Sequence, residues 1–109
     1  MAGFVKGDVV IIPFPFSDLT GSKKRPALVL ADLPGNDIIL CQLTSQNSGD
    51  PNIIVLTAGD FSSGGLQITS YIRPPRLFTA DKSIIVRKTG SVNAAVIARV
   101  TNILAKLLL

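Results

Sequence analysis

The chain has 109 residues, of which 47% are hydrophobic and 17% are charged, with 11 Lys and Arg against 7 acidic residues and a net charge of +4. This length predicts one domain over residues 1–109, which buries roughly 65% of the surface of its unfolded chain and needs neither a metal nor a disulfide to hold a core. The apolar content excludes disorder, and without a run of ~18 to 20 apolar residues or a signal peptide we expect a soluble cytoplasmic protein with no membrane partner.

The first predicted element is a strand at residues 9–16, an apolar run that contains Pro13 and Pro15. Proline has no N–H to donate to a ladder, so the far end of this strand should lie at a sheet edge or a bulge. Residues 17–24 then form a predicted loop of small polar residues. Because Leu19 is its one apolar anchor and Gly21 adds freedom, we expect this loop to be mobile.

Two strands follow at 27–31 and 38–43, joined by a Pro-Gly-Asn-Asp turn at 34–37. Both are too continuously apolar to lie on the surface. Further strands are predicted at 53–56, 66–72 and 83–87, with Gly64-Gly65 and Pro74-Pro75 as the breaks between them. The pattern predicts a mainly β (β-rich α+β) fold, a small curled barrel of about six or seven strands.

From Ser91 the period becomes helical, with apolar residues at spacings of three and four: Val92, Ala95, Val96, Val100, Ile103, Leu104 and Leu107. This predicts a C-terminal amphipathic helix with Ser91 as its N-cap. The closing Leu107, Leu108 and Leu109 exceed what one helix face needs. We expect them to pack either on the barrel or on a second subunit.

The residue types that are missing exclude several chemistries. The chain has no His and no Glu, and its Asp residues are scattered singly. Histidine catalysis is therefore excluded. With Cys41 as the single cysteine, neither an internal disulfide nor a zinc site of His and Cys can form. We expect a protein without a metal or another cofactor.

The positive charge favours an anionic partner. The pI is about 9.7, and Lys23, Lys24 and Arg25 concentrate cations in successive positions. Read alone, basic residues before a strand are more often a solvated edge than a binding site. Their neighbours in the sequence decide between these two interpretations.

Six short blocks supply that context: GDVV at 7–10, PFPFSD at 13–18, KKRPALVL at 23–30, LTSQ at 43–46, SYIR at 70–73 and RLFT at 76–79. With these blocks, in this order and over nearly its whole length, the chain resembles the MazF/PemK toxins of type II toxin-antitoxin systems. The resemblance implies an SH3-like barrel with a C-terminal helix that forms a homodimer.

The resemblance also implies a growth-inhibiting toxin, a ribosome-independent and metal-independent endoribonuclease that cleaves single-stranded RNA and binds a cognate antitoxin and, with it, DNA. RNA carries its own nucleophile in the 2′-OH beside the scissile phosphate, so such an enzyme works mainly by alignment and charge stabilisation. The family's catalytic arginine and threonine fall on Arg25 and Thr44. Arg25, a poor general base, would hold the phosphate with its planar fork while Thr44 donates to a non-bridging oxygen.

The remaining predicted site residues surround this pair. The expected RNA contacts are Lys23, Lys24, Ser45, Gln46, Arg73 and Arg76. The loop expected to gate the RNA groove consists of Ser17, Asp18, Leu19, Thr20, Gly21 and Ser22. Phe14 and Phe16 are interpreted as core residues rather than base-stacking platforms, and Cys41 as an inert buried thiol.

Two other function classes stay open. One is an SH3-like module that binds RNA or the antitoxin without turnover, because a fold does not determine a function. The other is a gyrase inhibitor similar to CcdB, which shares the barrel but acts through a C-terminal tail containing Trp. This chain has no Trp and ends in AKLLL, which makes the gyrase interpretation the weaker one.

Overall fold

The computed structural model describes residues 3–15 and 21–109. Within these ranges the secondary structure consists of the strands β1 (Asp8–Pro15), β2 (Ser22–Asp32), β3 (Asp37–Thr44), β4 (Ile54–Leu56), β5 (Phe61–Gly64), β6 (Ser70–Asp81) and β7 (Arg87–Val92), the 3-10 helices η1 (Ala58–Asp60) and η2 (Lys82–Ile84), and the C-terminal helix α1 (Ala94–Leu108). The predicted mainly β fold with a C-terminal helix is confirmed.

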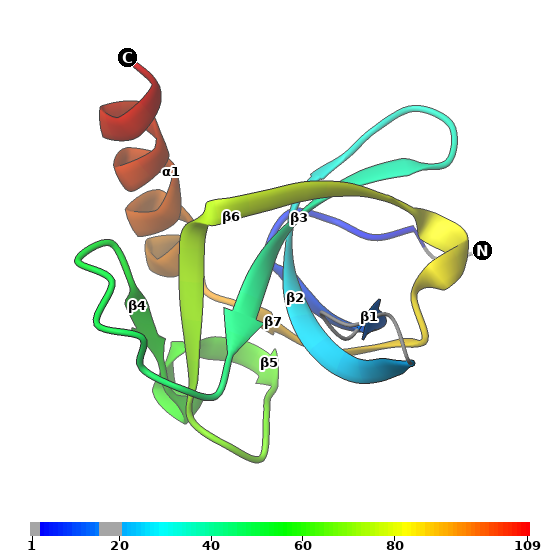
Figure 1. Cartoon of the computed structure of the whole chain (residues 1–109), viewed down its shortest axis with the longest axis horizontal. Coiled ribbons are helices and arrows are strands. Elements are labelled where there is room, and N and C mark those ends of the chain that lie inside the picture. Colours follow the sequence, from blue (N-terminus) through cyan, green and yellow to red (C-terminus); the bar gives the residue numbers. More distant parts are fainter. Residues whose placement is uncertain (1–2, 16–20) are drawn as a thin grey trace.

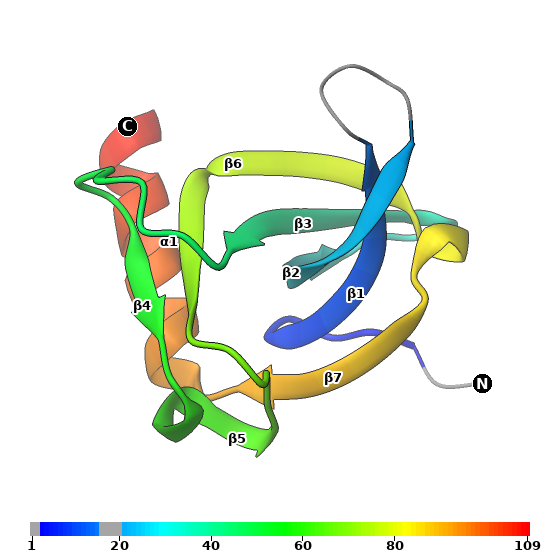
Figure 2. The same ribbon diagram turned by 60° about the horizontal axis from the view of Figure 1, so that its bottom comes forward.

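The described strands form one antiparallel sheet in the order β4-β6-β3-β2-β1-β7-β5. The sheet curls into a half-barrel, so its two edge strands β4 and β5 come close together at one corner, and α1 lies along that side (Figures 1 and 2). Strands β1, β2 and β3 occupy the middle of the sheet, between β6 and β7.

Both faces of the central strands are buried. Side chains alternate between the faces of a strand, so neighbours such as Val9 and Val10 enter different cores. One core, which includes Leu28 and Leu43, packs against Val96 and Val100 of α1. The other includes Val29 and Leu40 and is closed by partly buried residues such as Phe78. This confirms that residues 27–31 and 38–43 are interior strands.

The prolines of β1 lie where the strand needs no backbone N–H to pair with β7. β1 pairs with β2 from Val9 to Pro15 but with β7 only from Asp8 to Ile11. Pro13 and Pro15 therefore extend beyond β7, and the predicted edge position is confirmed.

Pro74-Pro75, predicted as a break between strands, lies inside β6. The β3–β6 register pairs Cys41 with Leu77 and then Leu43 with Ile72, which leaves residues 73–76 of β6 outside the ladder. Prolines are tolerated in a strand at such a bulge, where no N–H is needed. β6 bends sharply, which lets it pair with β3 along most of its length and with β4 at its start.

Several elements differ from the prediction. The strand predicted at 66–72 begins only at Ser70 and continues to Asp81. The strand predicted at 83–87 is wrong, because Asp81 accepts a hydrogen bond from the Ser83 N–H and caps η2, and β7 begins only at Arg87. β5 was not expected, since its FSSG sequence has a single apolar residue. The helix N-cap is Asn93, whose Oδ1 accepts from the Val96 N–H, while Ser91 belongs to β7.

The predicted 17–24 loop is shorter than expected, because β2 already begins at Ser22 and includes Lys23, Lys24 and Arg25. Ser17, Asp18, Leu19 and Thr20 of the expected gating loop, together with Phe16, lie outside the described residues. The gating role stays a prediction.

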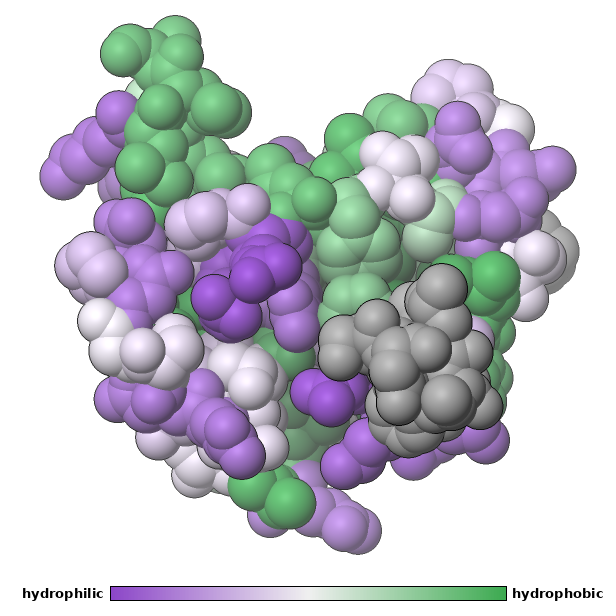
Figure 3. All heavy atoms as spheres, viewed as in Figure 1, coloured by the Kyte–Doolittle hydropathy of each residue, from purple (hydrophilic) through white to green (hydrophobic). Residues whose placement is uncertain are grey.

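The end of α1 presents apolar surface to solvent. Leu108 is 74% exposed and Leu109 fully exposed, whereas Ile103 and Leu104 one turn earlier pack on the core. Figure 3 shows this apolar surface at the free end of the helix. The leucines at the end of the chain are predicted to pack either on the barrel or on a second subunit. Packing on the barrel is wrong for Leu108 and Leu109. None of the helices that the structure describes is long and apolar enough to cross a membrane.

Candidate active site

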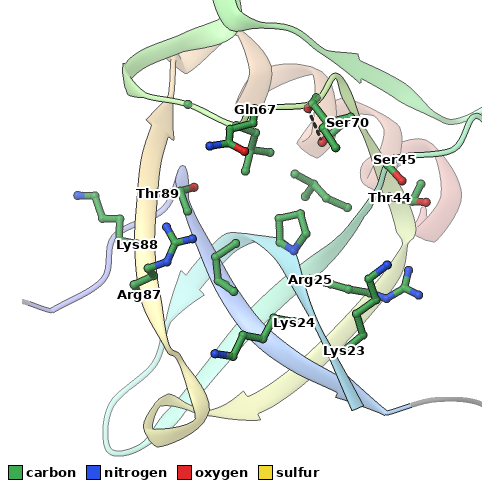
Figure 4. A pocket seen from close by; sticks show the side chains of 16 residues that line it. Lys23, Lys24, Arg25, Thr44, Ser45, Gln67, Ser70, Arg87, Lys88 and Thr89 are labelled. Carbon is green, nitrogen blue, oxygen red and sulfur yellow. Dashed lines mark hydrogen bonds between the residues drawn. The ribbon is translucent and has the colours of Figure 1, made fainter. Parts of the chain in front are cut away.

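A groove of about 610 Å³ opens on the sheet between β2 and β7 (Figure 4). Its apolar floor includes Ile11, Pro26, Leu43 and Leu66. Ile11 of β1 pairs with Pro26 on one side and with Arg87 on the other, and paired residues share a face of the sheet. The register of these strand pairs therefore places the floor residues Ile11 and Pro26 side by side. The polar and charged lining residues are Lys23, Lys24, Arg25, Thr44, Ser45, Gln67, Ser70, Arg87, Lys88 and Thr89.

The β2–β3 register brings Arg25 and Thr44 together. The ladder pairs Ala27 with Gln42. The ladder ends at this pair, with Arg25 two residues before Ala27 and Thr44 two residues after Gln42. Because side chains alternate along a strand, Arg25 and Thr44 start from one face, the face of Ile12, which pairs with Arg25. Figure 4 shows the two residues on the same rim of the groove, with Lys23 beside Arg25. Both Arg25 and Thr44 are half-buried.

The Thr44 hydroxyl is oriented by the chain that follows it. Its Oγ1 accepts a hydrogen bond from the Gln46 N–H at 3.2 Å. A hydroxyl has one hydrogen to donate besides its lone pairs, so this bond leaves the Thr44 O–H available for an acceptor in the groove. The Arg25 guanidinium on the same rim offers its donors in a planar fork that matches phosphate oxygens.

The groove is strongly positive. Lys23, Lys24, Arg25, Arg87 and Lys88 line it, and the described lining residues include no carboxylate. Lys88 alone has a partner in the described structure, the carboxylate of Asp8, with Nζ 3.4 Å from Oδ1. Such a concentration of one sign of charge attracts polyanions. Arg25, predicted as catalytic, and Lys23 and Lys24, predicted as RNA contacts, all line this groove.

Residues 5–108 match the model of the family described as PemK-like, MazF-like toxin of type II toxin-antitoxin system. The chain belongs to this family. The resemblance inferred from the six sequence blocks is thereby confirmed. A comparison with curated proteins found no significant match.

Solved structures with the same fold include three toxin-related proteins. An endoribonuclease in complex with its cognate antitoxin from a Mycobacterial species has 18% identity and a TM-score of 0.74, over 97% of this chain and 95% of that one. MazE-MazF from Deinococcus radiodurans has 25% identity and a TM-score of 0.75, over 94% of each chain. MazF from Deinococcus radiodurans has 23% identity and a TM-score of 0.76, over 99% and 98%.

Not every predicted RNA contact of this MazF-like protein lies in the groove. Ser45 lines it, but Gln46, Arg73 and Arg76 are not among the lining residues. Arg76 is exposed on the β6 bulge, which the sequence could not anticipate because the double proline reads as a break between strands. Arg73 is half-buried, and its Nε is enclosed without a hydrogen-bond partner in the described structure.

Five polar or charged lining residues of the toxin were missed: Gln67, Ser70, Arg87, Lys88 and Thr89. Arg87 is the last residue of the strand predicted at 83–87 and Lys88 follows it, and only the pairing of β1 with β7 brings this segment to the groove. Ser70, whose block was quoted for the resemblance, is buried and donates to the Ile68 carbonyl at 3.1 Å. That bond shapes the wall carrying Gln67.

Two sequence interpretations outside the groove are confirmed. Phe14 is half-buried and stacks on Phe78 with ring centroids 5.6 Å apart, so it packs at the margin of the core that Phe78 closes. Cys41 is buried and its thiol donates to the Arg73 carbonyl at 3.1 Å, while burial raises the pKa of Cys41 to about 12. It therefore carries no thiolate at neutral pH. In residues 3–15 and 21–109, no three Cys or Asp side chains gather as a possible metal site.

Proposed function

We propose that this toxin-family protein is a metal-independent endoribonuclease that cleaves single-stranded RNA at short sequences, with residues 1–109 acting as one domain. The observation that carries the proposal is that Arg25 and Thr44 lie on the same rim of a cationic groove. Similar structures described as endoribonucleases add support. A merely structural arginine would not need a hydroxyl donor and the three further cations Lys23, Lys24 and Arg87 around the same groove.

The reaction needs no nucleophile from the protein. The 2′-oxygen of the ribose attacks the adjacent phosphorus and forms a bond, the bond from phosphorus to the 5′-oxygen breaks, and the 2′-proton passes to water. The leaving oxygen takes a proton from water, which gives a 2′,3′-cyclic phosphate and a 5′-OH end. Arg25 stabilises the two non-bridging oxygens as their charge grows, and the Thr44 O–H donates to one of them.

The proposed partner that silences this activity is a cognate antitoxin, since similar solved structures contain one. The chemistry of the groove favours a segment that is acidic, apolar and disordered until bound. Its carboxylates would face cations such as Lys24, and its apolar side chains would cover the floor at Ile11 and Leu43.

The test of the function is an incubation of the purified protein with a mixed-sequence RNA in excess EDTA, followed by mass spectrometry of the new ends. We expect fragments that carry 2′,3′-cyclic phosphate, and no fragments with the Arg25→Ala protein. If folded, antitoxin-free protein yields no fragments, the protein is a binding module without turnover.

We also propose a homodimer, in which Leu107, Leu108 and Leu109 are covered by the second subunit. These side chains are 48%, 74% and 101% exposed in one chain, and burying them would remove a large apolar area from water. A variant that ends at Lys106 should then be monomeric by light scattering at concentrations where the full chain is dimeric. An unchanged dimer would show that the leucines lie outside the interface.

A further inference from the structure

We propose that Arg87 of β7 binds a backbone phosphate of the RNA on the rim opposite Arg25 and Thr44, as a further RNA-binding residue. The inference rests on the proposed function, because it takes the groove to hold RNA. It extends that function to the rim formed by β7, which none of the six sequence blocks reaches.

The sheet register directs Arg87 into the groove. Arg87 pairs with Ile11, which also pairs with Pro26, and these two residues form part of the groove floor. Because paired residues share a face, the Arg87 side chain rises from the same face as the floor. Figure 4 shows its guanidinium turned inward, near Thr89. Arg87 is exposed and forms no ion pair in the described structure.

Lys88, the neighbouring cation on β7, forms an ion pair with a buried carboxylate instead of facing the groove. Lys88 pairs with Val10, on the other face of the sheet, and Figure 4 shows its side chain pointing away from the groove. Its Nζ lies 3.4 Å from the Asp8 carboxylate, which is 1% exposed. The other bonds of that carboxylate come from the Ser91 hydroxyl at 2.8 Å and the Val5 N–H at 3.0 Å. Lys88 thus neutralises a buried acid, and Arg87 is the β7 cation that remains for a ligand.

Arg87 and the proposed catalytic pair are too far apart to share one phosphate comfortably. β7 is two strand positions from β2, which carries Arg25, and three from β3, which carries Thr44, paths of about 10 and 14 Å at the usual strand spacing. Arg25 pairs with Ile12 and Arg87 with Ile11, so the two arginines also start from opposite faces of the sheet. Their side chains stand on opposite rims in Figure 4. An RNA strand that places its scissile phosphate at Arg25 therefore meets Arg87 with a flanking nucleotide. The planar guanidinium suits the non-bridging oxygens of that flanking phosphate.

The test measures binding without cleavage. The probe is a labelled single-stranded RNA of mixed sequence with 2′-O-methyl groups at every ribose, which removes the nucleophile. Its affinity for the wild type, Arg87→Ala and Arg99→Ala is measured by fluorescence anisotropy over a range of KCl concentrations. Arg99→Ala is the matched control, because Arg99 is an exposed arginine on α1 and not a groove residue.

We expect Arg87→Ala to weaken binding about tenfold. The slope of log K against log[KCl] should become shallower by about 0.7, the value for one phosphate contact on a single strand. The loss should be equal for different RNA sequences, and Arg99→Ala should bind as the wild type does.

Equal affinities for Arg87→Ala and Arg99→Ala would overturn the inference, as would wild-type protein that fails to bind the probe. A loss confined to some sequences would also overturn it, because it would assign Arg87 to a base edge instead of a phosphate. The cleavage assay in EDTA is scored separately. If it yields no fragments while Arg87→Ala still loses affinity, the catalytic proposal fails and the phosphate contact stands.

Discussion

Replacing Arg25 by lysine is expected to slow RNA cleavage about 100-fold, and replacing it by alanine about 1,000-fold. Lysine keeps the charge but not the planar fork, so it cannot hold two non-bridging oxygens at once as their charge increases. The loss should appear in the rate at saturating protein rather than in RNA affinity, since the remaining groove cations still attract the strand. Single-turnover cleavage of one defined RNA measures this rate.

The matched control for this prediction is Arg99→Lys, the same exchange on the exposed face of α1. It should cleave at the wild-type rate. An Arg25→Lys protein within a few-fold of that rate would mean that a point charge suffices at this position. The bidentate role of Arg25 would then be wrong, even if the Ala variant were inactive.

Gly90→Ala is expected to destabilise the protein by about 2 to 3 kcal/mol. A Cβ at residue 90 would stand 2.6 Å from the Ser63 carbonyl oxygen and 2.7 Å from the Gly65 nitrogen. Both are backbone atoms, so the contact can be relieved only by moving β5 away from β7. Gly64 meets Gly90 from the other side and adopts φ +63°, so neither strand has room to give way.

Thermal unfolding followed by circular dichroism measures the effect, and a drop in Tm of about 10 °C or more is expected. Gly59→Ala is the control: its Cβ would have no atom within 4 Å, and its φ is not in the left-handed region. That variant should be neutral or slightly more stable, because alanine restricts the unfolded chain. A Gly90→Ala protein as stable as Gly59→Ala would show that β5 and β7 separate at little cost.

Sequence patterns identified only some of the residues that line the candidate site. Arg25 and Thr44 could be singled out because each stands in a recognisable block, and the structure places them on the same rim of the groove. Arg87 and Gln67 carry no such signal. They come from segments more than thirty residues after the end of β2, and they reach the groove only because the sheet curls. Arg73 and Arg76 were favoured by their charge, but the β6 bulge places them outside the groove lining.

Local sequence patterns were sufficient to predict the mainly β class, the interior strands around 27–31 and 38–43 and the C-terminal helix, and the composition excluded histidine and thiolate-zinc chemistry. These follow from local apolar periodicity and composition, which do not depend on distant contacts. Tertiary structure alone decided that Pro74-Pro75 bend a continuous strand, that residues 82–84 form a capped turn, and that β7 lines the groove. The bend of β6 and the β7 side of the groove depend on strand pairing between segments far apart in the chain. The turn at 82–84 combines its local Asp81 cap with hydrogen bonds from Lys82 to the Leu33 and Gly35 carbonyls, which local periodicity does not predict.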